Sequence, residues 1–150
     1  MNTISIRQAV LNDIEALSVL FDGYRQFYGR ASDVPAAKAF LIDRFDRGES
    51  VLFIAHDGDN PVGFTQLYPS FSSVSLGPIY ILNDLFVSES GRRKGVGSKL
   101  LAAAVNYGKT VGAIRLALST SNTNITAQAL YEMDGWERDD DFFYIYPLNR

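Results

Sequence analysis

The chain has 150 residues, 47% of them hydrophobic, and its 14 Lys and Arg against 17 Asp and Glu give a net charge of −3. This length and composition suit one globular domain, and the absence of cysteine excludes disulfides, thiol nucleophiles and cysteine-based zinc sites. The charge argues against nucleic-acid binding, and no apolar run is long enough to cross a membrane. We therefore expect a single soluble, cytoplasmic domain over residues 1–150, with no metal site and no nucleic-acid or membrane partner.

The first half of the chain predicts one strand, two helices and a β-hairpin. Apolar periodicity and turn residues place these elements, in chain order, at residues 4–10, 12–28, 32–48, 51–55 and 61–68. Asn12, followed by Glu15 three residues later, predicts a capping box at the start of the first helix. The serine-rich stretch 69–76 predicts a loop.

The second half predicts strands that alternate with helices, at residues 79–87, 98–110, 114–118, 126–133 and 142–148. The strand 79–87 is apolar at nearly every position and is interrupted only by Asn83 and Asp84. A continuous apolar strand is typical of a sheet that is covered on both faces. The order of elements therefore predicts an α/β or α+β class with a mixed sheet.

A glycine-rich turn with three adjacent cations at 92–94 follows the strand 79–87. Glycine lets the backbone approach a ligand closely, and the first N–H groups of the next helix, with the helix dipole, favour a phosphate. The alternative is a solvated basic turn. Neither nucleotide pattern, G-x-x-x-x-G-K-[ST] or G-x-G-x-x-G, is present, which leaves Arg92-x-x-Gly95-x-Gly97 on a strand-to-helix turn.

This pattern resembles the acetyl-coenzyme A binding motif of the GCN5-related N-acetyltransferase (GNAT) superfamily, which is Gln/Arg-x-x-Gly-x-Gly/Ala after a central strand. Residues 85–87 resemble the end of that strand, and 124–136 resembles the family's closing motif, with Gly-Trp where Gly-Phe is usual. Element order also matches, so the resemblance covers essentially the whole chain. One departure is that Gly91 and Arg93 stand where a bulkier residue and a glycine are more frequent, and we expect a changed loop path.

The resemblance implies an α+β fold, with a central mixed, mostly antiparallel sheet and about four helices on both faces. It implies acetyl-coenzyme A as co-substrate, held at the pyrophosphate by the loop residues Arg92, Arg93, Lys94, Gly95, Val96, Gly97 and Ser98. Leu85, Phe86 and Val87 would pair with the pantetheine arm as a strand does. Asn124 would hydrogen-bond the same arm or cap the helix that follows it, and both roles are open.

Two residues carry the implied chemistry. Tyr131 resembles the family's general acid, since a phenol with a pKa near 10 can protonate a departing thiolate; the alternative is an aromatic that packs the last helix. A base is also needed, because a primary ammonium with a pKa near 10.4 is uncharged in only about one molecule in 2,500 at pH 7. Asp84 is the candidate base or amine anchor, and the alternative is a structural salt bridge to Lys or Arg.

The expected function is direct transfer of an acetyl group from acetyl-coenzyme A to the primary amine of a small molecule, with polyamines and diamines as candidates. Tyr24, Tyr28 and Tyr68 would line the acceptor site and Asn83 would orient the amine, unless these aromatics belong to the core. The lack of cysteine favours transfer without an acyl-enzyme. Alternatives are a non-catalytic acyl-coenzyme A sensor and a protein or peptide lysine acetyltransferase.

A homodimer is a further expectation. The closing strand, residues 142–148, begins with five consecutive aromatic or aliphatic residues at 142–146. These side chains would form either the interface between two copies or part of the core. The two readings are both open at this stage.

Overall fold

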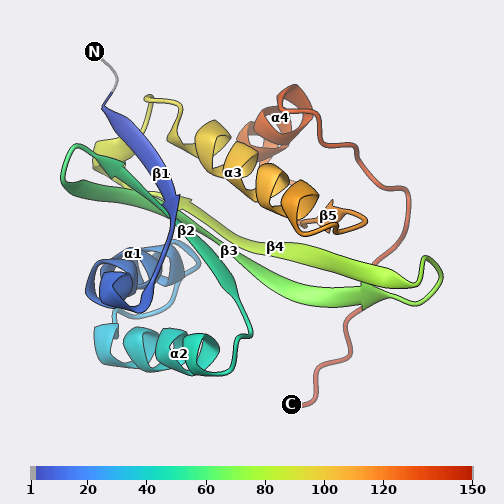
Figure 1. The fold of residues 1–150 in the computed structure, drawn as a ribbon, viewed down its shortest axis with the longest axis horizontal. Coiled ribbons are helices and arrows are strands. Elements are labelled where there is room, and N and C mark those ends of the chain that lie inside the picture. Colours follow the sequence, from blue (N-terminus) through green and yellow to red (C-terminus); the bar gives the residue numbers. More distant parts are fainter. Residues whose placement is uncertain (1–2, 150) are drawn as a thin grey trace. The chain divides into compact units, whose positions relative to one another are not determined.

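The structure, a computed structural model, describes residues 3–149. Its strands are β1 (Ile4–Gln8), β2 (Val51–Asp57), β3 (Asn60–Ser72), β4 (Gly77–Val87) and β5 (Leu116–Ala117). Its α-helices are α1 (Ile14–Phe27), α2 (Val34–Asp46), α3 (Val96–Thr110) and α4 (Ile125–Met133) (Figure 1). The chain divides into two compact units, Met1–Ser119 and Thr120–Arg150. The sheet and the first three α-helices belong to the first unit, and α4 belongs to the second.

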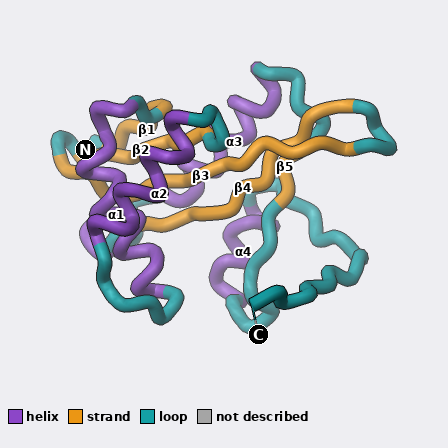
Figure 2. The backbone as a smooth tube through the Cα atoms, turned by 90° about the horizontal axis from the view of Figure 1, so that it is seen from below, coloured by secondary structure: helices purple, strands orange, loops and turns teal. Residues whose placement is uncertain are grey.

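All five strands form one sheet in the order β1-β2-β3-β4-β5. The first four are antiparallel to their neighbours and run side by side in Figure 2, whereas β5 is parallel to β4. This is the mixed, mostly antiparallel sheet that the family resemblance implies. The pairing of β5 with β4 is limited to Tyr80 and Ile81, so the last six residues of β4 extend beyond it.

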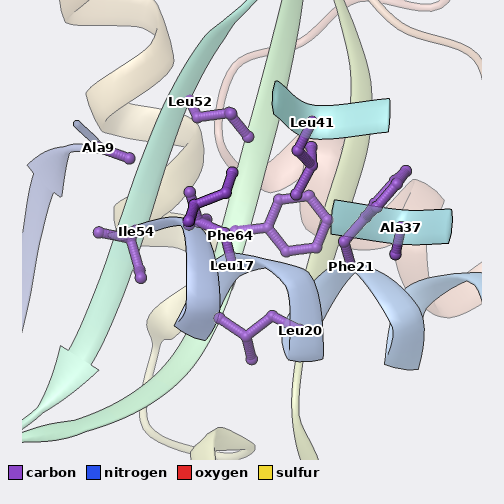
Figure 3. Close-up of a cluster of buried hydrophobic side chains, with 10 residues drawn as sticks. Ala9, Leu17, Leu20, Phe21, Ala37, Leu41, Leu52, Ile54 and Phe64 are labelled. Atoms are coloured by element: carbon purple, nitrogen blue, oxygen red, sulfur yellow. The ribbon is translucent and has the colours of Figure 1, made fainter. Parts of the chain in front are cut away.

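Helices cover both faces of the sheet within the first unit. Figure 1 shows α1 and α2 on one face and α3 on the other. The main core lies on the α1 face, where the ring of Phe64 is surrounded by Leu17 and Phe21 of α1 and Leu41 of α2 (Figure 3). Since these four side chains are at most 7% exposed, the α1 face is a water-excluded environment.

A β-bulge interrupts the pairing of the two central strands. Gln66 of β3 lies opposite Asp84 of β4, and Leu67 lies opposite Leu82, so Asn83 is an additional residue in β4. Side chains alternate between the faces of a regular strand, and one added residue reverses that alternation beyond it. The bulge therefore decides which face of the sheet receives the carboxyl group of Asp84.

The predicted helices and hairpin are confirmed, but three local predictions are wrong. The capping box on Asn12 does not form: residues 11–13 make a 3₁₀ turn, and the Asp13 carboxylate accepts the Val10 N–H at 2.8 Å while Arg7 fixes it at 2.6 Å. The loop predicted at 69–76 is shorter: residues 69–72 belong to β3, because β3 and β4 pair as far as Ser72 and Gly77, and only residues 73–76 form the turn between them.

The predicted closing strand 142–148 is the third error. Residues 137–149 contain neither helix nor strand, and the apolar side chains from Phe142 to Tyr146 are exposed. Strand propensity describes how well side chains fit a half-buried pleated surface, so composition alone does not form a strand. Among residues 3–149, no helix combines the length and apolar composition that a membrane crossing requires.

A buried carboxylate joins α1 to the start of α2. Asp22 is 3% exposed and accepts hydrogen bonds from the Asp33 N–H at 2.7 Å, the Ser32 hydroxyl at 2.7 Å and the Gln26 amide at 2.9 Å. These donors, the backbone N–H above all, hold the pKa of Asp22 below its usual range. The carboxylate therefore stays ionised and organises the helix connection.

We expect Asp22→Asn to lower the free energy of unfolding by about 1–3 kcal/mol at pH 7, because one amide hydrogen must face a donor. A lowered folded-state pKa gives stability that is present above the unfolded value of about 3.9 and is lost as pH falls through the folded value. The difference between variant and native chain should shrink in urea titrations taken from pH 7 to pH 2. The exposed Asp43→Asn is the control; an equal loss at every pH would contradict a role for the charge.

Candidate active site

Asp84 lies on the α1 face of the sheet and is 2% exposed. Its Oδ2 accepts a hydrogen bond from Nε2 of Gln66 on β3, and its Oδ1 accepts one from Nδ2 of Asn83 at 2.8 Å. The predicted alternative, a salt bridge to Lys or Arg, is wrong, since the ion pairs of the described residues do not include Asp84. The carboxylate is therefore supported by neutral donors only.

Two phenols from different elements lie near this carboxylate. Tyr24 of α1 donates its hydroxyl hydrogen to the main-chain oxygen of Asn83, at 3.2 Å, and so binds the bulge directly. The phenol groups of Tyr24 and Tyr68 both have pKa values well above the usual range, mainly through burial and then through the nearby charge of Asp84. The structure thus brings together Tyr24, Tyr68, Asn83 and Asp84, four of the predicted site residues.

The remaining predicted aromatic residue lies at the edge of this group. Tyr28, at the end of α1, is 63% exposed and contacts the Tyr24 ring edge-on, with a centroid distance of 5.1 Å. Tyr24 itself also packs against Phe64 and Phe86. The prediction left two readings open, acceptor site or core. The ring of Tyr24 packs against the core and its hydroxyl group is beside Asp84, so the core reading is confirmed and the acceptor role stays a prediction.

Burial raises the pKa of the Asp84 carboxyl group, because removal from water disfavours the charged form. The polar groups of Gln66, Asn83 and Tyr24 act in the opposite direction and are the smaller effects. A carboxylate whose pKa is shifted up toward neutrality is a more effective general base than an exposed one. The site therefore has a group that can accept a proton on the water-excluded face of the sheet.

Sequence reasoning missed Gln66. It is 0% exposed, lies directly opposite Asp84 in the β3–β4 pairing, and supplies a hydrogen bond to the carboxylate. The available signal was a polar amide in the predicted strand 61–68, beside Val62, Phe64 and Leu67. Two polar residues in adjacent buried strands need each other as hydrogen-bond partners, and this rule would have paired them.

The glycine-rich loop follows β4 and enters α3 through backbone conformations that favour glycine. Gly95, the N-cap residue of α3, has φ +74°, and Arg93 has φ +65°. The first bond of the helix joins the Lys99 N–H to the Gly95 carbonyl at 3.1 Å, so the N–H groups of the first three helical residues, 96–98, have no partner within the helix. This arrangement fits an anionic diphosphate group.

The cations of the loop are held differently from one another. Lys94 forms an ion pair with Asp57 at the end of β2, at 2.6 Å, whereas Arg92 and Arg93 are exposed and are in none of the ion pairs of the described residues. The Lys94 ammonium lowers the pKa of Asp57. Asp57 was not predicted; it fixes one end of the loop to the sheet and leaves two guanidinium groups to meet an anion.

The contacts of Gly91 give a physical reason why glycine, and not a bulkier residue, stands at this position of the loop. A Cβ atom at this position would lie 2.7 Å from the Cβ of Val62, closer than real Cβ contacts, so the loop packs against β3 without room for a side chain. Arg93 then occupies a left-handed conformation in which glycine is more frequent. The remaining coenzyme candidates of β4, Leu85, Phe86 and Val87, are half-buried and lie beyond the short β5.

In the second unit, α4 carries both remaining predicted residues. Asn124 caps this helix, with its Oδ1 accepting the Ala127 N–H at 3.2 Å, which confirms the capping role and uses only the amide oxygen. Tyr131 is half-buried and its ring lies 6.3 Å from that of Trp136, centroid to centroid. The predicted contact with pantetheine and the acid role remain predictions.

The helix end gives Tyr131 a fixed orientation. Gly135, with φ +95°, donates to the Glu132 carbonyl, and the Trp136 N–H donates to the Tyr131 carbonyl at 2.9 Å. These two backbone hydrogen bonds, together with the contact between the Tyr131 and Trp136 rings, make up a Schellman motif. The sequence Gly135-Trp136 therefore ends α4 and packs the indole ring against the phenol ring.

We expect Asp84→Asn to keep the fold and to gain stability, relative to the native chain, as pH rises from the unfolded pKa of about 3.9 to the raised folded pKa of Asp84. A raised folded-state pKa means that the folded native chain holds more protons than the unfolded chain in this window, so its stability falls as pH rises; the amide has no such penalty. Rotation of the Gln66 amide lets Oε1 accept from the new amide. Parallel urea titrations of both proteins measure this, and a difference that is constant with pH would contradict it.

We expect Arg93→Asn to raise the free energy of unfolding by up to about 1 kcal/mol, because asparagine tolerates the left-handed region better than arginine. Arg92→Asn is the matched control: it removes a neighbouring exposed cation whose φ is −70°. Thermal and urea unfolding of both variants measures the effect. Equal stability of the two would show that the loop is not strained at residue 93.

The chain is similar in sequence and in structure to known acetyltransferases. The model of the acetyltransferase (GNAT) family matches residues 17–136. The uncharacterized N-acetyltransferase YhfO of Bacillus subtilis (strain 168) is 49% identical over 146 residues, which cover 97% of each chain. A crystal structure of a probable acetyltransferase is 41% identical, with a TM-score of 0.91, covering 97% of this chain and 99% of the other.

A more distant structure shows the same fold. Aminoglycoside N-acetyltransferase AAC(6')-Iy, solved in complex with CoA, is 22% identical with a TM-score of 0.82, covering 98% of this chain and 96% of the other. The five-stranded mixed sheet with helices on both faces is the α+β fold of these acetyltransferases. Because the family model matches 17–136 and close relatives match along nearly the full length, the chain belongs to the acetyltransferase (GNAT) family.

Proposed function

We propose that this acetyltransferase uses acetyl-coenzyme A and transfers its acetyl group directly to the primary amine of a small molecule, with diamines and polyamines as the first candidates. The observation that carries the proposal is Asp84, a carboxylate that is 2% exposed, has only neutral donors as partners, and lies beside two half-buried phenols. A negative group bordered by aromatic rings suits an alkylammonium ion. The family model spans parts of both compact units, which supports one domain over residues 1–150.

The residues of the loop and of β4 suit the coenzyme. The N–H groups of residues 96–98 and the guanidinium groups of Arg92 and Arg93 would bind the pyrophosphate, while Leu85 to Val87 offer a strand edge to the pantetheine arm. The coenzyme supplies an acetyl thioester, whose carbonyl carbon accepts the amine. The complex of AAC(6')-Iy with CoA supports binding of an acyl-coenzyme A to this fold.

Proton transfers are assigned to two side chains. Asp84 accepts one proton from the ammonium group, which frees the nitrogen lone pair to form the new C–N bond. Tyr131 donates its phenolic proton to the sulfur as the C–S bond breaks. The second proton on the attacking nitrogen restores the phenol through solvent, and Asp84 releases its proton to water. The products are the N-acetyl amine, the free thiol and one proton.

We expect thiol release from acetyl-coenzyme A with at least one amine of a panel of polyamines, diamines, amino acids, aminoglycosides and a lysine peptide. The chain contains no cysteine, so every thiol that a colorimetric reagent detects is product. Tyr131→Phe should lower kcat by about 100-fold or more and leave the Kd for acetyl-coenzyme A within about twofold, since the lost proton acts only in the transition state.

Tyr107→Phe is the matched control, because Tyr107 is a half-buried tyrosine of α3 that contacts Phe53 and Tyr80. Unchanged turnover in Tyr131→Phe would remove the acid role. Binding of acetyl-coenzyme A without thiol release from any amine would favour the sensor alternative. Release with the lysine peptide alone would favour a protein acetyltransferase. Size-exclusion chromatography with light scattering tests the proposed homodimer.

A further inference from the structure

We infer that Gln66 is a positioning residue for Asp84, whose amide supports the ionised carboxylate through Nε2 and, after rotation, the protonated carboxyl group through Oε1. This inference rests on the proposed role of Asp84 as the base. A base must be stable both before and after it accepts its proton, because a partner suited to one state alone would hold the carboxyl group in that state. A carboxamide carries a donor and an acceptor on one rotatable group.

The geometry gives Gln66 a fixed place beside the carboxyl group. The two residues are direct cross-strand neighbours in the β3–β4 pairing, and both are nearly completely buried. Phe64, two residues earlier on β3, packs on α1, so Gln66 lies on the same face. Within the described residues, the donors to the Asp84 carboxylate are side-chain amides, and none is a backbone N–H group. Side-chain amides, unlike backbone groups, can rotate to follow the proton.

The amide oxygen of Gln66 is the second observation. Oε1 is buried, and among residues 3–149 it has no hydrogen-bond partner. An unpaired buried carbonyl is unfavourable, so a Gln that served only to hold an ionised carboxylate would carry an unused acceptor. That acceptor has a use once Asp84 is protonated, because the carboxyl O–H then needs an oxygen in the place that Nε2 occupies now.

Asp22 shows the opposite arrangement in the same chain. Its partners include a backbone N–H, which cannot rotate, and its pKa is lowered. The titratable group that acts on Asp84 is the phenol of Tyr24 from α1; the charge of Asp84 in turn raises the pKa of Tyr68 from β3, which Arg44 of α2 lowers. No cation is among the groups that shift the pKa of Asp84. The neutral amide of Gln66 is therefore the main adjustable partner.

The test replaces Gln66 by Met, which has a similar volume and no donor. We expect the pKa of Asp84 to rise, the acidic limb of kcat/KM to move to higher pH, and kcat/KM below that limb to fall by about 10- to 100-fold. Raising the pH should restore kcat/KM to near the native value, because Asp84 itself is intact. Gln66→Glu is a second variant of equal shape and should move the limb further, since a like charge raises the pKa more.

Thr65→Val is the matched control. Thr65 is the adjacent residue of β3, is 0% exposed, and donates to the main-chain oxygen of Asp84 at 2.7 Å rather than to its carboxylate. This variant should lose stability and keep the acidic limb in place. A limb that stays in place in Gln66→Met, or moves equally in Thr65→Val, would overturn the inference.

A second measurement separates this inference from the proposed function. The carbon-13 NMR titration of the Asp84 carboxyl group, assigned by its loss in Asp84→Asn, needs no substrate. A titration that moves to higher pH in Gln66→Met supports the positioning role even if no amine is acetylated, in which case the proposed acceptor class is wrong. A titration that is unchanged in Gln66→Met removes the positioning role whatever the activity.

Discussion

Burial of one carboxyl group on the core face of a β-sheet is the constraint on which the rest of this site depends. Removal of Asp84 from water is unfavourable unless its oxygens are hydrogen-bonded, and the chain supplies amide donors from the facing strand and from the neighbouring residue. The same burial raises the pKa of the carboxyl group. The Asn83 bulge makes this possible, since a regular strand would turn Asp84 to the α3 face.

The end of β4 joins this carboxyl group to the loop that precedes α3. Past the bulge, residues 84–87 extend beyond the two-residue β5, and Gly91 then packs on Val62 of β3 without room for a side chain. The loop is therefore anchored to the sheet at Gly91 and, through the Lys94–Asp57 ion pair, at the end of β2. One segment of about fifteen residues thus positions both the Asp84 carboxyl group and a row of helix N–H groups.

Most of the fold follows from sequence patterns, and the failures have a common cause. Periodicity and turn residues predict the four helices and the first strands because those signals are local. The exposed segment 142–148 has the composition of a strand, but strand formation depends on a pairing partner, which composition does not reveal. The bulge is also invisible in the sequence, since it is a property of how two strands align.

The candidate site, like the fold, contains residues that the sequence predicts and residues that it does not. Asp84 stands out as a charge in an apolar strand, and Tyr131, Asn124 and the loop residues follow from a family resemblance. Gln66 and Asp57 were not predicted, because each matters only through a partner far away in the chain. A pairing rule for polar residues in buried strands would have found Gln66, whereas nothing in the sequence connects Asp57 with Lys94.

The two buried carboxylates of the described chain show how the same functional group is given two uses. Asp22 is bound by a backbone N–H, a hydroxyl and an amide, and this donor set keeps it charged at the junction of α1 and α2. Asp84 has side-chain donors and, within the described residues, no backbone N–H among its hydrogen-bond partners; burial is the largest effect on it, so its pKa moves in the opposite direction. Donors that cannot move select one protonation state and favour stability, whereas donors that can rotate allow both states, which is what a proton acceptor requires.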